Sequence, residues 1–196
     1  MNYHPKKMLS IIKSRIKEIK ASGPLKDGPQ AAVLIPCFEK NNELYIVMTE
    51  RSRNLPSHAG EVAFPGGKRE NDDQSLVDTA IRESLEEINL NPQDVKIIGE
   101  LNTLESRFGL SVTPFVAEIK ADLILSPDPA EVEEIFTIPL SFFKNNPEIS
   151  SKITNYKGES FDTPVFTYET HKIWGLTLAF TLNFLELLDI QFDYDL

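Results

Sequence analysis

Cysteine is almost absent from this sequence, because Cys37 is the one cysteine in 196 residues. A single cysteine excludes an internal disulfide, and alone it cannot form a thiolate metal site. It lies in the apolar segment AAVLIPCF, which spans residues 31–38. A thiol in such a segment is more often buried and inert than nucleophilic, so we expect no cysteine chemistry.

Long apolar runs are also missing. No stretch approaches the roughly 18–20 apolar residues that cross a bilayer. The first residues, MNYHPKKMLSIIKSRIKEIK, contain neither an uninterrupted apolar segment nor the small-residue cleavage site of a secretory signal. The last residues, DYDL, match no C-terminal address signal. We therefore expect a cytoplasmic protein.

Basic residues are in the minority, with 20 Lys and Arg against 30 Asp and Glu, and the formal net charge is −10. Neutralising phosphates requires a basic surface, so this composition argues against broad binding to nucleic acid or to anionic membranes. If the substrate is itself an anion, an acidic protein must recruit a cation to bind it.

The length of 196 residues and the hydrophobic content of 41% suit one domain with a proper core. Hydrophobic patterns and turn residues predict the following strands: 31–38, 44–50, 95–101, 111–119, a short strand or turn at 135–140, and a hairpin within 163–174. Helices are predicted at 75–88 and at 175–188, and the second is so apolar that it should be largely buried. Strands around two or three helices indicate a single α/β or α+β domain.

An amphipathic, basic helix is predicted at the N terminus. Apolar residues recur at helical spacing from Met8 to Ile19, with lysines and arginines between them, and SGP at 22–24 ends the pattern. We divide the chain into a helical extension, residues 1–24, packed on a domain of residues 25–196. The basic face is expected to be solvated; the alternative is that its lysines help to hold an anionic ligand.

Three glutamates share one stripe of the helix at 75–88. With about 100° per residue, Glu87 lies about 40° to one side of Glu83 and Glu86 about 60° to the other. Such carboxylates can bind Mg²⁺ or Mn²⁺, but alone they more often form a solvated surface. The opposite face, expected to pack on a sheet, consists of Val77, Ile81, Ser84, Leu85 and Ile88.

A loop with two glycines precedes this helix. In FPGGKREND, residues 64–72, Gly66 and Gly67 allow backbone amides to come close to a ligand. No Gly-Lys-Ser/Thr follows, so the loop is not a P-loop. A glycine loop that leads into an acidic helix is a place where a diphosphate can meet metal ions.

Loop and helix together resemble the Nudix box, the signature of Nudix hydrolases, whose usual form is G-x5-E-x7-R-E-U-x-E-E-x-G-U with U a bulky aliphatic. Gly67 and the run RESLEEINL at 82–90 carry the resemblance. One extra residue separates Gly67 from the arginine, so Asp73 is the nearest equivalent of the first glutamate. Ser84 replaces an aliphatic residue, and Asn89 replaces the glycine, a mild change because Asn tolerates the left-handed conformation.

The preceding segment, VMTERSRNLPSHAGEVAFPGG at 47–67, resembles the signature of coenzyme A pyrophosphatases, a Nudix subfamily. The residues in register are Thr49, Arg51, Ser52, Gly60, Phe64, Pro65, Gly66 and Gly67. Pro56 stands where that signature has a second arginine. With weaker matches farther on, the resemblance covers residues 31–180.

The resemblance implies a Nudix fold, a mixed β-sheet sandwiched between helices, to which the N-terminal helix is added. It implies a pyrophosphohydrolase that uses Mg²⁺ or Mn²⁺ to cut coenzyme A or its derivatives to 3′,5′-ADP and 4′-phosphopantetheine. Glu83 and Glu87 are implied as metal ligands, Glu86 as a third ligand or water-activating group, and Arg82 as the residue that orients the glutamates.

For substrate binding we select Arg51, whose guanidinium can grip phosphate, together with Gly66, Gly67 and His58. A general base from a distant loop is also usual in the family, and the candidates are Glu131, Glu133 and Glu134. His171 and Trp174 are expected to serve the fold.

Two other interpretations stay open: a Nudix hydrolase of another diphosphate such as ADP-ribose or NADH, and a non-catalytic, nucleotide-binding Nudix protein. The sequence also leaves open whether the chain forms a homodimer.

Overall fold

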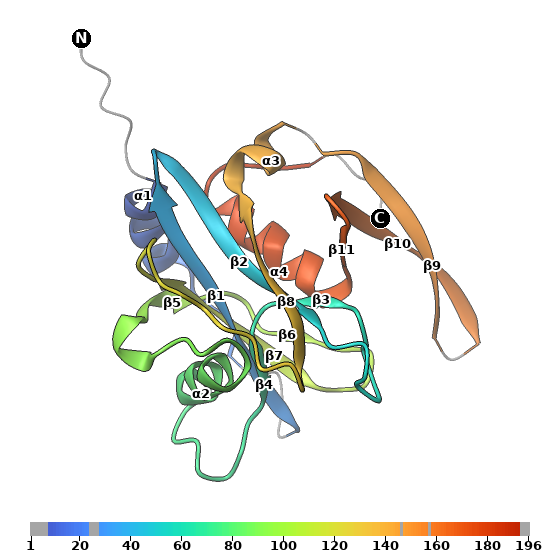
Figure 1. The fold of residues 1–196 in the computed structure, drawn as a ribbon. Coiled ribbons are helices and arrows are strands. Elements are labelled where there is room, and N and C mark those ends of the chain that lie inside the picture. The colour runs from blue at the N-terminus through green and yellow to red at the C-terminus, as the bar shows by residue number, and fades with distance from the viewer. Residues whose placement is uncertain (1–7, 24–27, 146, 157, 193–196) are drawn as a thin grey trace.

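The computed structural model describes residues 8–23, 28–145, 147–156 and 158–192. Its centre is an eight-stranded sheet (Figure 1). The strands are β1 (Gln30–Lys40), β2 (Glu43–Arg51), β3 (Val62–Ala63), β4 (Gly66–Lys68), β5 (Lys96–Glu100), β6 (Leu104–Glu105), β7 (Ser111–Glu118) and β8 (Val132–Pro139).

The sheet is mixed, as predicted. Its main order is β3-β2-β1-β7-β5, while β4 pairs with β1, β6 with β7 and β8 with β2. Strands β1 and β7 run parallel, and the other pairs of this sheet are antiparallel. The predicted element at 135–140 is a full strand that begins earlier, at Val132, so Glu133 and Glu134 belong to a strand and not to a loop.

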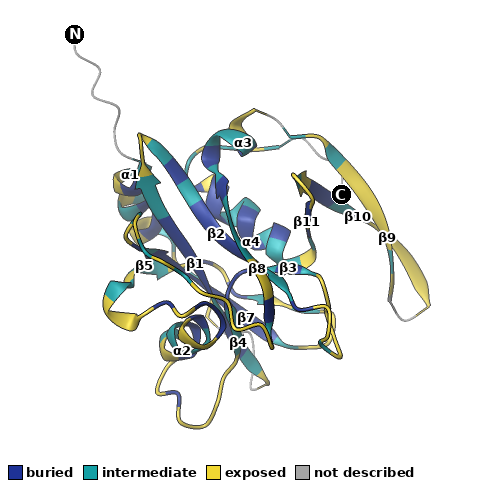
Figure 2. Ribbon diagram, viewed as in Figure 1, coloured by how far each residue is buried: buried dark blue, intermediate teal, exposed yellow. Residues whose placement is uncertain are grey.

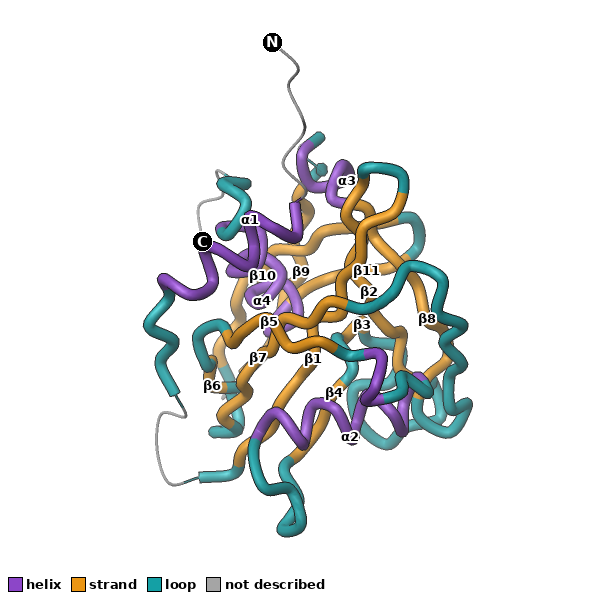
Figure 3. Tube along the Cα trace, turned by 90° about the vertical axis from the view of Figure 1, so that its left-hand side faces the viewer, coloured by secondary structure: helices purple, strands orange, loops and turns teal. Residues whose placement is uncertain are grey.

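Helices cover both faces of this sheet (Figure 3). Helix α2 (Leu76–Ile88) covers one face, and the other carries α1 (Met8–Arg15), the 3₁₀ turn η1 (Ile16–Glu18) and α4 (Gly175–Glu186). The alternation of β1 divides the core: Ala32 and Leu34 pack in the cluster on the α2 side, whereas Ala31 and Ile35 pack in the cluster with α4. The dark core between the layers is visible in Figure 2. A short turn η2 (Pro92–Asp94) follows α2, and α3 (Leu140–Lys144) follows β8.

A second, three-stranded sheet extends from the body of the protein (Figure 1). It contains β9 (Ile149–Tyr156), β10 (Glu159–Tyr168) and β11 (His171–Trp174) in the order β11-β10-β9. The β10–β11 pair is the predicted late hairpin. Strand β9 was not predicted, because its sequence ISSKITNY is mostly polar and its described residues are largely exposed.

The N-terminal helix packs on the domain through Leu9, Ile12 and Ile16, which are buried in the same cluster as α4. Two of its basic residues pair with acidic groups of the domain, because Lys13 Nζ lies 2.7 Å from Glu118 and Arg15 Nη2 lies 2.6 Å from Asp189. These contacts favour a structural role for the helix. The predicted boundary at residues 24 and 25, and Lys6 and Lys7, lie outside the described residues.

The apolar segment predicted at 175–188 forms α4, and it is buried through residues such as Leu178, Phe180 and Phe184. None of the helices in the described ranges is both long enough and apolar enough to cross a membrane.

Candidate metal and active site

Local sequence signals explain where α2 begins and ends. Ser75 is its N-cap, and the Ser75 hydroxyl accepts a hydrogen bond from the Asp78 amide. Asn89 ends the helix in the left-handed conformation, with φ of 53°, and its amide donates to the carbonyls of Leu85 and Ser84. The predicted helix at 75–88 is therefore confirmed, and Asn89 fills the role that glycine has in the Nudix box.

The predicted packing face of α2 was wrong by about a quarter turn. Leu85 was expected to pack on the sheet but is 40% exposed, whereas Glu87 is 3% exposed. The buried face is centred on Ala80, and the small side chains of Ala80 and Ser84 let the helix approach the sheet closely. The Ser84 hydroxyl donates to the Ala80 carbonyl at 2.7 Å, so this buried polar group is satisfied.

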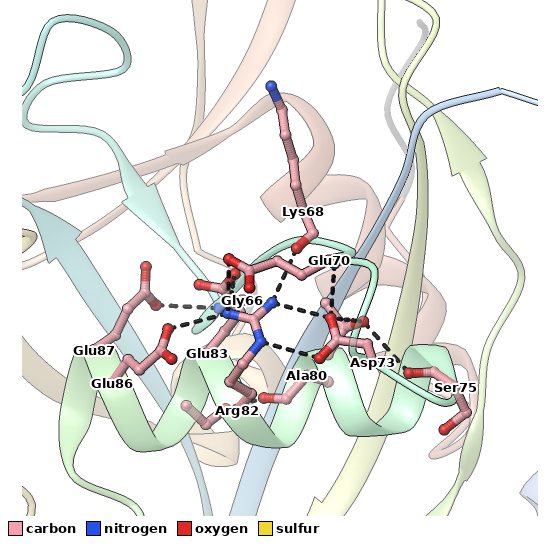
Figure 4. Close-up of polar contacts among 12 residues, drawn as sticks. Gly66, Lys68, Glu70, Asp73, Ser75, Ala80, Arg82, Glu83, Glu86 and Glu87 are labelled. Atoms are coloured by element: carbon pink, nitrogen blue, oxygen red, sulfur yellow. Dashed lines mark hydrogen bonds and ion pairs between the residues drawn. The ribbon is translucent and has the colours of Figure 1, made fainter.

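Arg82 links four acidic or carbonyl groups around the start of the site (Figure 4). Its Nε donates to Asp73 at 3.0 Å, and its Nη1 lies 3.0 Å from Glu83 and 3.1 Å from Glu86. Its Nη2 also donates to the Lys68 carbonyl. The Arg82 guanidinium holds the pKa of the Asp73 carboxyl well below its usual range. Asp73 thus anchors the arginine that orients two of the three glutamates.

Glu87 lies deepest of the three glutamates. Its carboxylate accepts a hydrogen bond from the Gly66 amide at 3.1 Å and lies 3.5 Å from Arg51 Nη1. Burial raises the pKa of Glu87 to about 7, and the negative charges of Glu83 and Glu131 raise it further. The Gly66 amide and the Arg51 guanidinium lower it, but less than burial raises it. A buried carboxylate that feels the negative charges of Glu83 and Glu131 favours the binding of a cation.

The two loop glycines allow this close packing. A Cβ on Gly67 would stand 2.5 Å from the Glu83 carboxylate. Gly66 has a φ of 154°, and a Cβ there would collide with the Ala32 carbonyl. Burial also raises the pKa of Glu83, and Arg82 opposes that shift. The glycines predicted in a loop thus lie in β4, and the backbone of this strand lies directly against Glu83 and Glu87.

The three glutamates differ in how ready they are to bind a metal ion. Arg82 holds Glu83 and the half-exposed Glu86, so a metal ion would compete with this guanidinium for their oxygens. Within the described ranges, the residues that bring three ligand atoms within 4.8 Å of one another are instead Glu50, Glu134 and His171. The Glu83–Glu87 pair still fits a divalent cation, because Glu87 is buried, the Glu83 side chain is only 14% exposed, and the pKa values of both carboxyl groups are raised.

Arg51 and His58, the other predicted contacts, have different surroundings. Arg51 lies beside Glu87, and its buried Nε has no hydrogen-bond partner among the described residues, so it retains a free donor. His58 lies in the exposed loop between β2 and β3, where its Nδ1 is 2.9 Å from Glu61. The structure therefore brings Arg51 to the glutamates, while the hydrogen bond of His58 is to its own loop.

The structure distinguishes between the candidates for the general base from outside α2. The loop at 126–131 is tied to the end of α2, because the Asp128 amide donates to the Glu87 carbonyl at 2.9 Å. Glu131 follows in this loop, and its charge raises the pKa of both Glu83 and Glu87. Glu134 instead pairs with His171, 3.2 Å away.

An apolar pocket of about 210 Å³ lies on the other side of the glycine strand, against α4. It is lined by Ala31, Val33, Ala63, Phe64, Gly66, Gly67, Lys68, Leu110, Val112, Leu176, Thr177 and Phe180. The sequence analysis missed it, because its residues come from four separate segments of the chain. Only the small side chains at Ala31, Ala63 and the two glycines hinted at space there.

The family model for the NUDIX domain matches residues 28–154. The chain belongs to the Nudix family. The predicted Nudix fold, with a mixed sheet between helices, is thereby confirmed.

Relatives of this Nudix hydrolase are found in bacteria and plants. A protein of Photorhabdus laumondii subsp. laumondii, named uncharacterized Nudix hydrolase NudL, is 40% identical over 147 residues, which are 75% of this chain and 78% of that protein. Nudix hydrolase 15, mitochondrial, of Arabidopsis thaliana is 37% identical over 161 residues, which are 79% of this chain but 56% of that protein. A crystal structure of a C. elegans Ap4A hydrolase binary complex has a TM-score of 0.49 at 18% identity, covering 58% of this chain and 82% of that chain.

Proposed function

We propose that this Nudix hydrolase cleaves the diphosphate of coenzyme A or a coenzyme A derivative, giving 3′,5′-ADP and 4′-phosphopantetheine. The observation that carries the proposal is the position of Glu87. Its carboxylate joins the amide of Gly66 to the guanidinium of Arg51, and both partners belong to the segment at 47–67 that resembles the coenzyme A pyrophosphatase signature.

Glu83 and Glu87 would hold a divalent cation, Mg²⁺ or Mn²⁺, with Glu86 as a third ligand or as the group that activates water. Such a cation supplies charge neutralisation of the diphosphate and a more acidic water. Arg82 holds Glu83 and Glu86 from the side of Asp73, so it sets their direction without needing to touch the substrate.

Arg51 and the glycine loop would position the diphosphate. Among the described residues the buried Nε–H of Arg51 has no partner, and the contact of its Nη1 to Glu87 is long at 3.5 Å, so the guanidinium would be able to turn and donate to a phosphate oxygen. The loop at Gly66 and Gly67 has no side chains that would keep phosphate oxygens away from its backbone. His58 remains a proposed substrate contact through its loop.

Glu131 is our choice for a proton acceptor besides Glu86. It is the one of the three candidates whose charge acts on both Glu83 and Glu87. Because side chains alternate along β8, Glu134 faces away from α2 and pairs with His171.

The pocket beside α4 would take a non-phosphate part of the substrate. It is apolar and shares Gly66 and Gly67 with the loop that contacts Glu83 and Glu87. A ligand whose diphosphate lies at the glycines can therefore reach this pocket with one of its ends.

A substrate panel tests the proposal. The purified protein is assayed with Mg²⁺ and with Mn²⁺ against coenzyme A, ADP-ribose and NADH at equal concentrations. The proposal predicts the highest kcat/KM for coenzyme A, with release of 4′-phosphopantetheine. A clear preference for ADP-ribose or NADH would refute coenzyme A as the substrate. The assignment as a Nudix hydrolase would still stand.

A second experiment tests the metal site. Glu86→Gln and Glu87→Gln should each lower kcat by about 100-fold or more. Each removes a carboxylate that would hold the metal ion or activate water, and the metal ion stabilises the charge of the transition state. Glu186→Gln, the same change at an exposed position of α4, is the matched control and should leave kcat unchanged. Normal turnover in both glutamate variants of the site would defeat the metal assignment.

One observation favours a second candidate, a Nudix hydrolase of another nucleoside diphosphate derivative. Pro56 occupies the place of the second arginine in the coenzyme A signature, and it lies exposed in the loop between β2 and β3. Pro56→Arg should therefore raise kcat/KM for coenzyme A relative to ADP-ribose if coenzyme A is the substrate, and an unchanged ratio would favour the second candidate.

A further inference from the structure

On the face of the sheet opposite α2, three metal-ligating side chains from three strands meet. They are Glu50 of β2, Glu134 of β8 and His171 of β11. His171 Nε2 lies 3.2 Å from Glu134 Oε2 and 3.6 Å from Glu50 Oε2, and one ligand atom of each residue lies within 4.8 Å of the other two. The proposed catalytic site makes no use of this cluster.

The negative charges of the two carboxylates in the cluster have few positively charged partners among the described residues. Glu50 and Glu134 are direct cross-strand partners in the antiparallel β2–β8 pair, where like charges destabilise a sheet. Arg53 reaches the other oxygen of Glu50 at 3.4 Å, but its side chain is 77% exposed. Glu134, which is 55% exposed, has His171 as its ion-pair partner in the described part of the chain.

The imidazole of His171 is buried beside the two carboxylates. The ring is 4% exposed and stacks on Phe136 with 3.7 Å between the ring centroids. Its Nδ1 is buried and has no hydrogen-bond partner among the described residues. The Nε2 atom of this buried ring therefore faces both carboxylates.

Two of the three separations between the ligand atoms match those of a metal site, and the third is within 4.8 Å. Two ligands of a tetrahedral Zn²⁺ ion, with bonds of about 2.0–2.1 Å, lie roughly 3.3 Å apart. The two separations of 3.2 and 3.6 Å from His171 Nε2 are close to this value. One imidazole nitrogen with two carboxylates is also a donor set that suits zinc.

We propose that Glu50, Glu134 and His171 form a second divalent-metal site, with Zn²⁺ as the fitting ion. Glu134 gives the ion access from solvent, and water completes the coordination. The ion neutralises the cross-strand carboxylate pair and ties β11, hence the second sheet, to β2 and β8 of the first. Because ligation moves the ring proton to the unpartnered Nδ1, binding is weaker by about 10–100-fold than in a site whose histidine has an outer hydrogen-bond partner.

Zinc binding to purified, metal-free protein tests the proposal. The full chain carries Glu83→Gln and Glu87→Gln as a background, so that zinc at the proposed catalytic site does not contribute. Equilibrium dialysis should find one Zn²⁺ per chain, and zinc should raise the thermal unfolding temperature. X-ray absorption of the bound zinc should show one imidazole in a shell otherwise made of oxygen.

In that background, Glu134→Gln and His171→Gln should each weaken zinc binding by more than about tenfold, and His171→Gln should remove the imidazole signal. Glu133→Gln is the matched control, because it removes the same charge at the neighbouring, exposed position of β8, and it should bind zinc like the background. If His171→Gln fails to fold by circular dichroism, the exposed Glu134→Gln decides. Background protein that binds no zinc, or cluster variants that bind it as tightly as the background, would overturn the proposal.

Discussion

Replacing Gly67 by alanine should displace the Glu83 carboxylate while leaving the stability of the fold nearly unchanged. The variant therefore tests whether activity depends on the position of Glu83. A Cβ at residue 67 would stand 2.5 Å from the Glu83 carboxylate, whereas ordinary contact begins at 3.4 Å. The carboxylate, which Arg82 holds at 3.0 Å, or the β4 backbone must therefore move. The φ of Gly67 is outside the left-handed region, so alanine costs nothing in backbone conformation.

The displacement required is about 0.9 Å, and a misplacement near 1 Å at a catalytic group can cost about 100-fold in rate. We therefore expect Gly67→Ala to lower kcat by about 100-fold, equivalent to about 2.7 kcal/mol. The free energy of unfolding should change by less than about 1 kcal/mol, because alanine also reduces the entropy of the unfolded chain.

The measurements are kcat and KM with coenzyme A in Mg²⁺, and urea denaturation of the same samples. Gly28→Ala is the control, because a Cβ at residue 28 meets nothing within 4 Å, and it should match the wild type in both assays. Activity of Gly67→Ala within twofold of wild type would show that the position of Glu83 does not limit turnover. A loss of activity matched by unfolding would show that the packing argument was wrong.

Three further predictions concern stability and reactivity. Asp73→Asn should lower the free energy of unfolding by about 2 kcal/mol at pH 7, since the charged hydrogen bonds to Arg82 are lost. Because the folded pKa of Asp73 lies below its unfolded value of about 3.9, that contribution is complete above about pH 5 and is lost as the pH falls through the folded pKa. The difference between variant and wild type in urea denaturation should thus shrink at pH 3, and a constant difference would contradict the assignment. Ser75→Ala should cost about 1 kcal/mol in the same assay through loss of the α2 N-cap; an unchanged midpoint would contradict it. Burial raises the pKa of the Cys37 thiol, so a thiol reagent should modify the protein only after unfolding; rapid modification of native protein would contradict it.

The sequence allowed α2 to be placed correctly because its limits depend on neighbouring residues. Ser75 and Asn89 form their capping hydrogen bonds with residues only three to five positions away, so the rules for helix caps are enough to predict where α2 begins and ends. The rotation of the helix was not predictable in the same way. Leu85 is apolar and Glu87 is charged, yet the small side chains at Ala80 and Ser84 decide which side approaches the sheet.

Features built from distant segments were beyond the sequence analysis. Glu50, Glu134 and His171 are far apart in the chain. The β2–β8 pairing brings the two glutamates together, and the packing of β11 on the first sheet, where His171 stacks on Phe136, brings the imidazole to them. His171 alone is more often a residue of the fold, and that was the prediction. Strand β9 forms by pairing with β10 and not through an apolar pattern of its own, so hydrophobic periodicity did not find it.

The position of β4 restricts the outline of any molecule that fills the whole site. The Glu83 carboxylate lies against one side of Gly67, while the apolar pocket opens on the side of α4. A compact anion such as inorganic pyrophosphate can occupy only the first of these regions. In the proposed binding mode, an elongated molecule with a diphosphate in its middle would use both, because Gly66 and Gly67 border each of them. If the diphosphate lies at the glycines as proposed, selectivity should depend on the groups that extend beyond the two phosphates as well as on charge.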